Sequence, residues 1–144
     1  MRNQSNVCRV LVVDGQGGGI GSQLVKLLRA CLPEDCELIG VGTNVLATNA
    51  MLKAGATHCA TGENAIVFNA ARADIILGPI GVVMANGILG EVSPKMATAI
   101  SGADAKKVLI PSFTCGIYVA GTEDCRMEEY LRRAVQIVMQ VIAE

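Results

Sequence analysis

The sequence predicts an α/β protein with a three-layer, Rossmann-like fold. Its mainly parallel, doubly wound sheet is expected to have five to six strands, with helices on both faces. Short apolar runs alternate with segments of helical periodicity, which is the pattern of βαβ units. Four turns that leave apolar runs contain glycine, and the first places five glycines in seven positions. The length of 144 residues fits a single domain, residues 1–144.

Three strands and three helices are expected in the first half of the chain. Apolar runs predict strands over residues 8–14, 36–41 and 57–60. Apolar residues at helical spacing predict a helix over residues 21–32, a second that stops at Gly55, and a third that ends near residue 72. Gly55 suits a helix end because glycine adopts left-handed backbone without steric cost. Thr61 is expected to cap the third helix, with Glu63 in its first turn.

The second half of the chain continues this alternation. Strands are predicted over residues 74–77 and 107–110. Two short helical pieces are expected between these strands. One follows Gly81, and the other starts at Ser93 with Pro94 in the first helical position.

The end of the chain predicts a last strand and a long helix. Residues 116–120 indicate a sixth strand, antiparallel at the sheet edge. Thr122 is expected to open a C-terminal helix with an apolar face that Tyr130, Ile137 and Val141 make unusually broad. This face has two interpretations, a deeply packed final helix and a subunit interface.

Composition favours an assembled protein. Hydrophobic residues make up 51% of the chain and charged residues 17%, below the usual share of about a quarter. So few charges cover the surface of a monomer poorly, and we therefore expect a homo-oligomer.

Charge and hydropathy exclude several classes of partner. The net charge is −1 and no basic run occurs, which argues against nucleic acid. No stretch approaches the roughly 20 apolar residues of a membrane helix, and the polar first residues do not indicate a signal peptide. The six cysteines form no zinc-like group with His58, so we expect reduced thiols, no metal site and a cytoplasmic location.

The glycine-rich turn is the strongest candidate for a binding site. A strand that turns through glycines into a helix exposes backbone N–H groups at the positive end of the helix dipole, where anions bind. The turns after parallel strands meet at one edge of a sheet, so the other glycine turns are expected to complete the site. The candidate cofactor-binding residues are Asp14, Gly15, Gln16, Gly17, Gly18, Gly19, Ile20, Gly21, Gly42, Thr43, Asn44, Thr61, Gly62, Glu63, Asn64, Gly78 and Pro79.

A nucleotide or dinucleotide such as NAD(P) is the ligand that this turn predicts. No Lys-Ser/Thr pair follows the glycines, which excludes a Walker A loop and leaves phosphate binding to backbone amides. The spacing Gly15-x-x-x-Gly19-Ile20-Gly21 resembles that of short-chain dehydrogenases. However, the second strand ends without the usual ribose-binding acid, and no Tyr-x-x-x-Lys pair is present.

Two residues carry alternative interpretations. Asp14 either shapes the loop by accepting its N–H groups, or serves in Mg²⁺ coordination or proton transfer. Cys115, in an expected loop at a strand end, is the best candidate for a reactive thiol.

The chain also resembles an uncharacterised family of short bacterial proteins, defined as a domain of unknown function. The resemblance covers nearly the whole chain and rests on residues 12–21, Gly42-Thr43-Asn44, residues 60–67 and Gly78-Pro79-Ile80-Gly81. It implies a Rossmann-like fold and carries over no functional residues. Three functions stay open: a binding protein for a nucleotide, a small enzyme in which Asp14, Glu63 or Cys115 acts on a phosphorylated or carboxylated metabolite, and a non-catalytic structural or partner-binding subunit.

Overall fold

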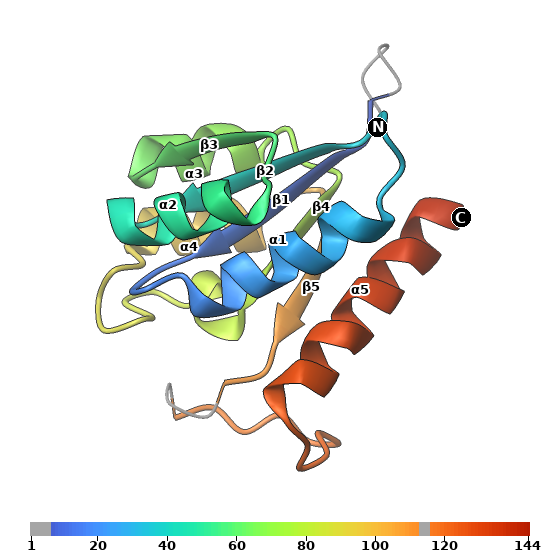
Figure 1. Cartoon of the computed structure of the whole chain (residues 1–144). Coiled ribbons are helices and arrows are strands. Elements are labelled where there is room, and N and C mark those ends of the chain that lie inside the picture. Colours follow the sequence, from blue (N-terminus) through green and yellow to red (C-terminus); the bar gives the residue numbers. More distant parts are fainter. Residues whose placement is uncertain (1–6, 113–115) are drawn as a thin grey trace.

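Five parallel strands form the centre of the molecule, in the order β3-β2-β1-β4-β5 (Figure 1). A computed structural model describes residues 7–112 and 116–144, and it confirms the Rossmann-like α/β prediction. The strands are β1 (Arg9–Asp14), β2 (Glu37–Gly42), β3 (His58–Thr61), β4 (Ile75–Pro79) and β5 (Lys106–Ile110).

The strand order reverses at β1. The chain builds outward from β1 to β2 and β3, then returns to place β4 and β5 on the other side. Val10, Leu11 and Val12 of β1 pair with β4 on one side while the same residues pair with β2 on the other. The carboxyl ends of β1 and β4 therefore flank the topological switch point, where doubly wound sheets bind ligands.

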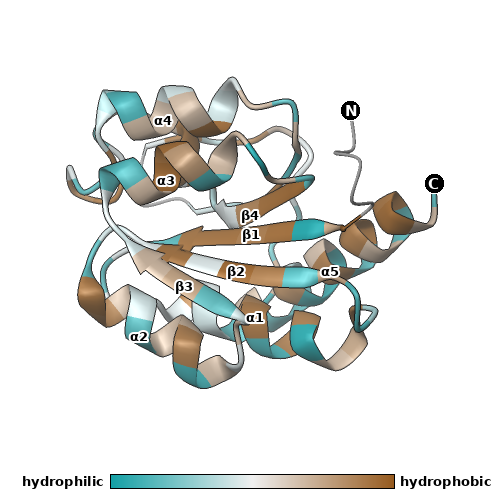
Figure 2. Cartoon of the chain, turned by 90° about the horizontal axis from the view of Figure 1, so that it is seen from above, coloured by the Kyte–Doolittle hydropathy of each residue, from teal (hydrophilic) through white to brown (hydrophobic). Residues whose placement is uncertain are grey.

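Helices cover both faces of the sheet (Figure 2). One face carries α1 (Gly19–Cys31), α2 (Val45–Ala54) and α5 (Met127–Ala143). The other carries α3 (Glu63–Ala70), the 3-10 helix η1 (Ile80–Val83) and α4 (Pro94–Ser101). None of the helices among the described residues combines the length and hydropathy that crossing a bilayer demands.

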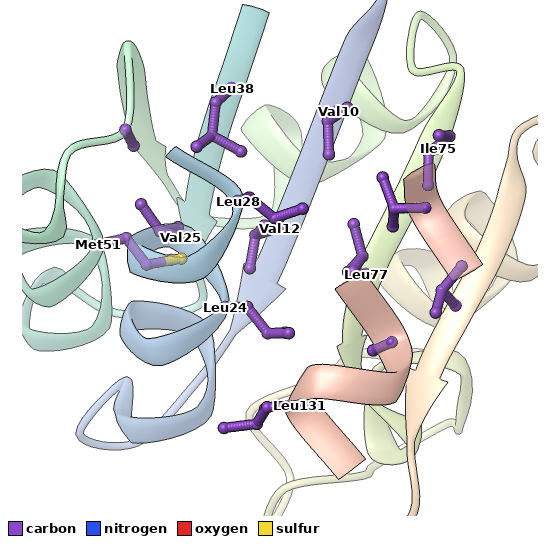
Figure 3. Close-up of a cluster of buried hydrophobic side chains, with 14 of the residues drawn as sticks. Val10, Val12, Leu24, Val25, Leu28, Leu38, Met51, Ile75, Leu77 and Leu131 are labelled. Carbon is purple, nitrogen blue, oxygen red and sulfur yellow. The ribbon is translucent and has the colours of Figure 1, made fainter. Parts of the chain in front are cut away.

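Alternation along β1 supplies both cores. Val10 and Val12 face α1 and α5, where Leu24, Leu28 and Leu131 pack against them (Figure 3). Leu11 and Val13 point to the opposite core, under α3 and α4. Strands buried on both faces read as continuous apolar runs, which is why β1 was recognisable in the sequence. Aliphatic burial of this kind is worth about 1.5–3 kcal/mol per large side chain and anchors the edge that carries the site.

The predicted helix ends at Gly55 and Ser93 are confirmed. Gly55 terminates α2 with φ 115°, and Ser93 caps α4 by accepting the Met96 N–H at 3.2 Å. The expected cap at Thr61 is wrong, because Thr61 ends β3 and its hydroxyl is 2.7 Å from that of Thr48. Gly62, with φ 103°, is the N-cap residue of α3, so this helix has no side-chain cap.

The predicted sixth strand is also wrong. Residues 116–120 form no strand and are mostly exposed, and Gly116 has a φ of 73° that breaks an extended path. Thr122 does not open the last helix either, because its hydroxyl and its N–H both bind the Val119 carbonyl. The helix begins at Met127 instead, after a turn that Arg133 holds through an ion pair with Glu123 at 3.2 Å.

The broad face of α5 is mainly a packing surface of its own chain. Leu131, Ala134 and Val138 are fully buried, and Tyr130 and Val141 pack against the same core. Ile137 stays 45% exposed. The structure therefore supports the deeply packed interpretation of this helix.

Candidate functional site

A cavity of about 550 Å³ opens at the switch point between β1 and β4. The first glycine turn forms one wall, the end of β4 forms another, and the loop of residues 84–89 forms a third. The lining residues are Asp14, Gly15, Gln16, Ile20, Pro79, Gly81, Met84, Ala85, Asn86, Gly87, Ile88, Leu89 and Ser112. The volume lies within the range of small-molecule sites.

The glycine turn has a fixed shape. The Gly18 N–H donates to the Gly15 carbonyl at 2.9 Å, which closes a tight turn directly before α1. Gly18 has φ 72°, and a Cβ there would lie 2.8 Å from the Ala47 Cα. Glycine is therefore required at residue 18 both for the left-handed backbone and for the close approach of α2.

Asp14 holds the turn from inside. Its side chain is 5% exposed, and its Oδ1 accepts the Gly15 N–H at 2.7 Å while Oδ2 accepts the Gly21 N–H at 2.6 Å. Burial raises the pKa of this carboxyl above its ordinary value of 3.8, the hydrogen bonds from Gly21 and Gly15 lower it, and nearby Glu91 raises it. This is the loop-shaping geometry, since both carboxylate oxygens are committed to amides of the turn.

Glu91, which no motif in the sequence singles out, also binds the turn. Its carboxylate accepts the Gln16 N–H at 3.1 Å, the Thr43 hydroxyl at 2.7 Å and the Asn44 side-chain amide at 2.6 Å. The hydrogen bonds from Thr43, Asn44 and Gln16 lower the pKa of Glu91 below its ordinary value of 4.5 against its own partial burial. A single Glu in a loop gives no sequence signal, because its partners are 47 to 75 residues away.

Asn44 connects three parts of the site. Its Oδ1 caps α2 by accepting the Ala47 N–H at 3.0 Å, and its Nδ2 donates to the Gln16 carbonyl at 3.0 Å as well as to Glu91. The predicted residues Gln16, Thr43 and Asn44 are thus brought together, with Glu91 as their common partner.

Three amides of the turn remain available. Among the described residues, nothing accepts a hydrogen bond from the N–H groups of Gly17, Gly19 and Ile20. They belong to the N-terminus of α1 and the turn before it, where the helix dipole favours negative charge. Neither lysine nor arginine is among the described residues that line the cavity. Of the three amides, that of Ile20 belongs to a lining residue, and those of Gly17 and Gly19 lie between the lining residues Gln16 and Ile20 in the chain.

The loop that covers the site is held in an unusual backbone conformation. Asn86, Ile88 and Leu89 have φ values of 63°, 53° and 52°. Left-handed backbone is costly for a β-branched residue such as Ile88, about 1–3 kcal/mol. The side chain of Ile88 reaches both Gly15 and Gly81, where added Cβ atoms would lie 3.2 Å from it. This packing and the Glu91 hydrogen bonds fix the loop on the turn.

Some of the remaining predicted residues allow close backbone contacts, and others lie at the β3 edge of the sheet. Gly78 allows β4 to pass β1, since a Cβ would lie 2.4 Å from the Val13 carbonyl oxygen, and Pro79 lines the cavity. Gly42 makes room for the first turn of α2, with a Cβ only 2.6 Å from the Thr48 nitrogen.

The third glycine turn lies away from the cavity. Thr61 ends β3, which is two strands from β1, and Gly62, Glu63 and Asn64 follow it. None of these four is among the lining residues. Glu63 accepts the Ser93 hydroxyl at 2.6 Å and so joins the starts of α3 and α4. Cys115 lies outside the described residues.

The sheet order and the glycine turn at its switch point define a Rossmann-like α/β protein. The chain belongs to the DUF3842 family, a domain of unknown function whose family model matches residues 9–143. The resemblance to a domain of unknown function is thereby confirmed. No curated protein matches the sequence.

Two solved structures are similar in fold. One is a dodecameric FMN-dependent UbiX-like decarboxylase from Escherichia coli O157:H7, at 15% identity and a TM-score of 0.52, with 94% of this chain and 95% of that chain covered. The other is AibC, at 15% identity and a TM-score of 0.47, with 92% of this chain and 44% of that chain covered. The first likeness supports the Rossmann-like assignment.

Proposed function

We propose that this protein binds a phosphate-bearing nucleotide cofactor at the carboxyl edge of its sheet. In this proposal the N–H groups of Gly17, Gly19 and Ile20 hold the phosphate. The rest of the ligand occupies the cavity beside Pro79 and Gly81. NAD(P) and FMN are both members of this class, FMN being the cofactor of the similar decarboxylase.

The observation that carries the proposal is the coincidence of a cavity, a switch point and free amides. The cavity of about 550 Å³ lies where doubly wound folds place ligands, and the glycine turn forms its wall. Without a lysine or arginine among its described lining residues, the site depends on backbone N–H groups and the dipole of α1, as nucleotide sites of this fold do.

The hydrogen bonds of the acidic candidates, Asp14 and Glu63, favour a binding role for the site over catalysis by these residues. Both oxygens of Asp14 accept hydrogen bonds from amides, and Glu63 accepts a hydrogen bond from the Ser93 hydroxyl. These carboxylates hold the turn and the ends of two helices. We therefore assign the site a binding role and derive no reaction step from it.

Thermal unfolding with a ligand panel tests the proposal. The panel contains FMN, FAD, NAD⁺, NADP⁺, AMP and inorganic phosphate. At a ligand concentration of 100 times Kd, binding adds about 2.7 kcal/mol to the unfolding free energy, so Tm should rise by several degrees. No shift with any nucleotide would contradict the proposal.

A variant at residue 19 locates the ligand on the turn. A Cβ at Gly19 meets nothing within 4 Å, so Gly19→Val should fold while its side chain covers the free amides. We expect this variant to lose at least tenfold in affinity. Ala30→Val, on the exposed surface of the same helix, is the matched control and should bind as the wild type does.

A further inference from the structure

Glu91 occupies the part of the site where a dinucleotide would place its second half. In dinucleotide-binding folds, the pyrophosphate lies on the glycine turn and the ribose beyond it is held by an acid at the end of the second strand. Here the polar groups at that strand end, Thr43 and Asn44, already donate to the Glu91 carboxylate at 2.7 and 2.6 Å.

The lining of the open cavity does not include these groups. Its walls come from β1, β4 and the covering loop, and they include none of Thr43, Asn44 and Glu91. The free amides of Gly17, Gly19 and Ile20 offer one group of donors, which suits a single phosphate. The Gln16 amide, which would serve a second phosphate, donates to both oxygens of Glu91 at 3.1 and 3.2 Å.

Electrostatics also oppose a second phosphate there. The Glu91 carboxylate is stabilised by three donors beside the start of α2, a position that favours one negative charge. A phosphate entering the same place would have to displace a charge that is already hydrogen-bonded, or lie next to it. Both alternatives cost binding energy.

The backbone of its loop fixes the position of the Glu91 carboxylate. The loop that carries it passes through left-handed Asn86, Ile88 and Leu89, and it closes on itself through hydrogen bonds from Asn86 to Val92 and from Val92 to Gly87. Ile88 packs between Gly15 and Gly81 and fixes the loop from the cavity side.

We infer that Glu91 is a specificity-determining residue that restricts this site to mononucleotides. It does so by occupying, as a carboxylate of the chain itself, the donors on which the second half of a dinucleotide would lie. The inference rests on the proposed function and narrows it to ligands with a single phosphate group.

Matched ligand pairs test the inference. FMN and FAD differ only in the adenylate half, as do nicotinamide mononucleotide and NAD⁺. Isothermal titration of the wild type should show that the mononucleotide of at least one pair binds at least tenfold more tightly than its dinucleotide. In Glu91→Ala this preference should fall at least tenfold, because the donors that the carboxylate occupies become available to the dinucleotide.

One further variant serves as a control, and another separates the charge of Glu91 from its shape. Glu34→Ala removes an exposed carboxylate at the opposite end of the sheet and should keep the wild-type preference. Glu91→Gln preserves the shape of the side chain and loses its charge, so it should give an intermediate preference. Circular dichroism and thermal unfolding of each variant establish that it folds.

The outcomes distinguish the inference from the proposal beneath it. Mononucleotide binding with the same preference in wild type and Glu91→Ala overturns the inference and leaves the proposed function standing. A loss of dinucleotide affinity in Glu91→Ala also overturns it, because Glu91 would then be the acid that accepts ribose hydroxyls. If no nucleotide binds the wild type or Glu91→Ala, both the proposed function and the inference fail.

Discussion

At the scale of single residues, Asp14 should contribute to stability through the two amides it accepts. In Asp14→Asn one carboxylate oxygen becomes an NH₂ group, which faces the N–H of Gly15 or Gly21 and leaves that donor unpaired. Loss of this buried hydrogen bond should lower the unfolding free energy by about 1–3 kcal/mol, as measured by urea denaturation. Asp35→Asn, at an exposed turn, is the control and should change it by less than about 0.5 kcal/mol. An unchanged midpoint for Asp14→Asn would contradict the loop-shaping role.

The contribution of Glu91 to the unfolding free energy should depend on pH in the opposite direction to that of Asp14. Its folded-state pKa is lowered, so its stabilising contribution is present above its ordinary value of 4.5 and is lost as pH falls through the lowered value. Asp14, whose pKa is raised, contributes stability that is lost as pH rises. Asp14 is present in both wild type and Glu91→Gln, so its contribution cancels in their difference except for the repulsion by Glu91, the smallest cause of its raised pKa. The stability advantage of wild type over Glu91→Gln should therefore be constant from pH 6 to 7.5 and shrink below pH 4.5. An advantage that stays constant or grows on acidification would show that the carboxylate is not held as described.

These two acids show which part of a site sequence reasoning can reach. Asp14 is adjacent to the glycines, so its interaction with their amides follows from local chemistry. Glu91 reaches the same turn from 75 residues away, through a loop whose path depends on packing around Ile88. The absence of an acid after the second strand was visible in the sequence, but the acid that lies there instead was not.

At the scale of elements, neighbouring glycines of the turn should respond oppositely to alanine. Gly17 has open space around a Cβ and no left-handed backbone, so Gly17→Ala should leave stability unchanged or raise it by about 0.4–1 kcal/mol. Gly18 has φ 72° and lies against α2, so Gly18→Ala should destabilise the fold by more than about 1 kcal/mol. Chemical denaturation of the two variants gives the comparison. Equal effects would mean that α1 and α2 do not approach each other at Gly18.

The elements that the sequence predicted correctly are those with strong local signals. β1, β2 and β4 are apolar on both faces, and Gly55 and Ser93 mark helix ends by their own backbone and side-chain chemistry. The strand prediction for residues 116–120 is wrong because it rests on apolar composition, whereas glycines at 116 and 121 turn the chain. The start of α5 failed because Thr122 binds a preceding carbonyl, a choice that depends on the path of the chain.

At the scale of the whole molecule, α2 carries a group of exposed apolar side chains, and others such as Phe68, Leu89 and Tyr118 lie on other segments. Val45, Leu46 and Leu52 are 62%, 73% and 52% exposed on a ten-residue helix whose one charged residue is Lys53. Figure 2 shows hydrophobic stretches on this helix at the outer side of its layer. On α5, by contrast, Tyr130 and Val141 pack on their own core. A homo-oligomer of this chain should therefore assemble through α2 rather than through α5.

Light scattering of the eluting protein at micromolar concentration tests this expectation. The wild type should have a mass of two or more chains, because burying these three side chains against a second copy removes apolar area from water at about 25 cal/mol per Å². The double variant Leu46→Glu, Leu52→Glu should elute with the mass of one chain, since it places charges in the contact and leaves the buried Met51 untouched. Ile137→Glu changes an exposed apolar residue of α5 to the same charge and should keep the wild-type mass. A monomeric wild type would contradict assembly itself, and dissociation by Ile137→Glu alone would move the contact from α2 to α5.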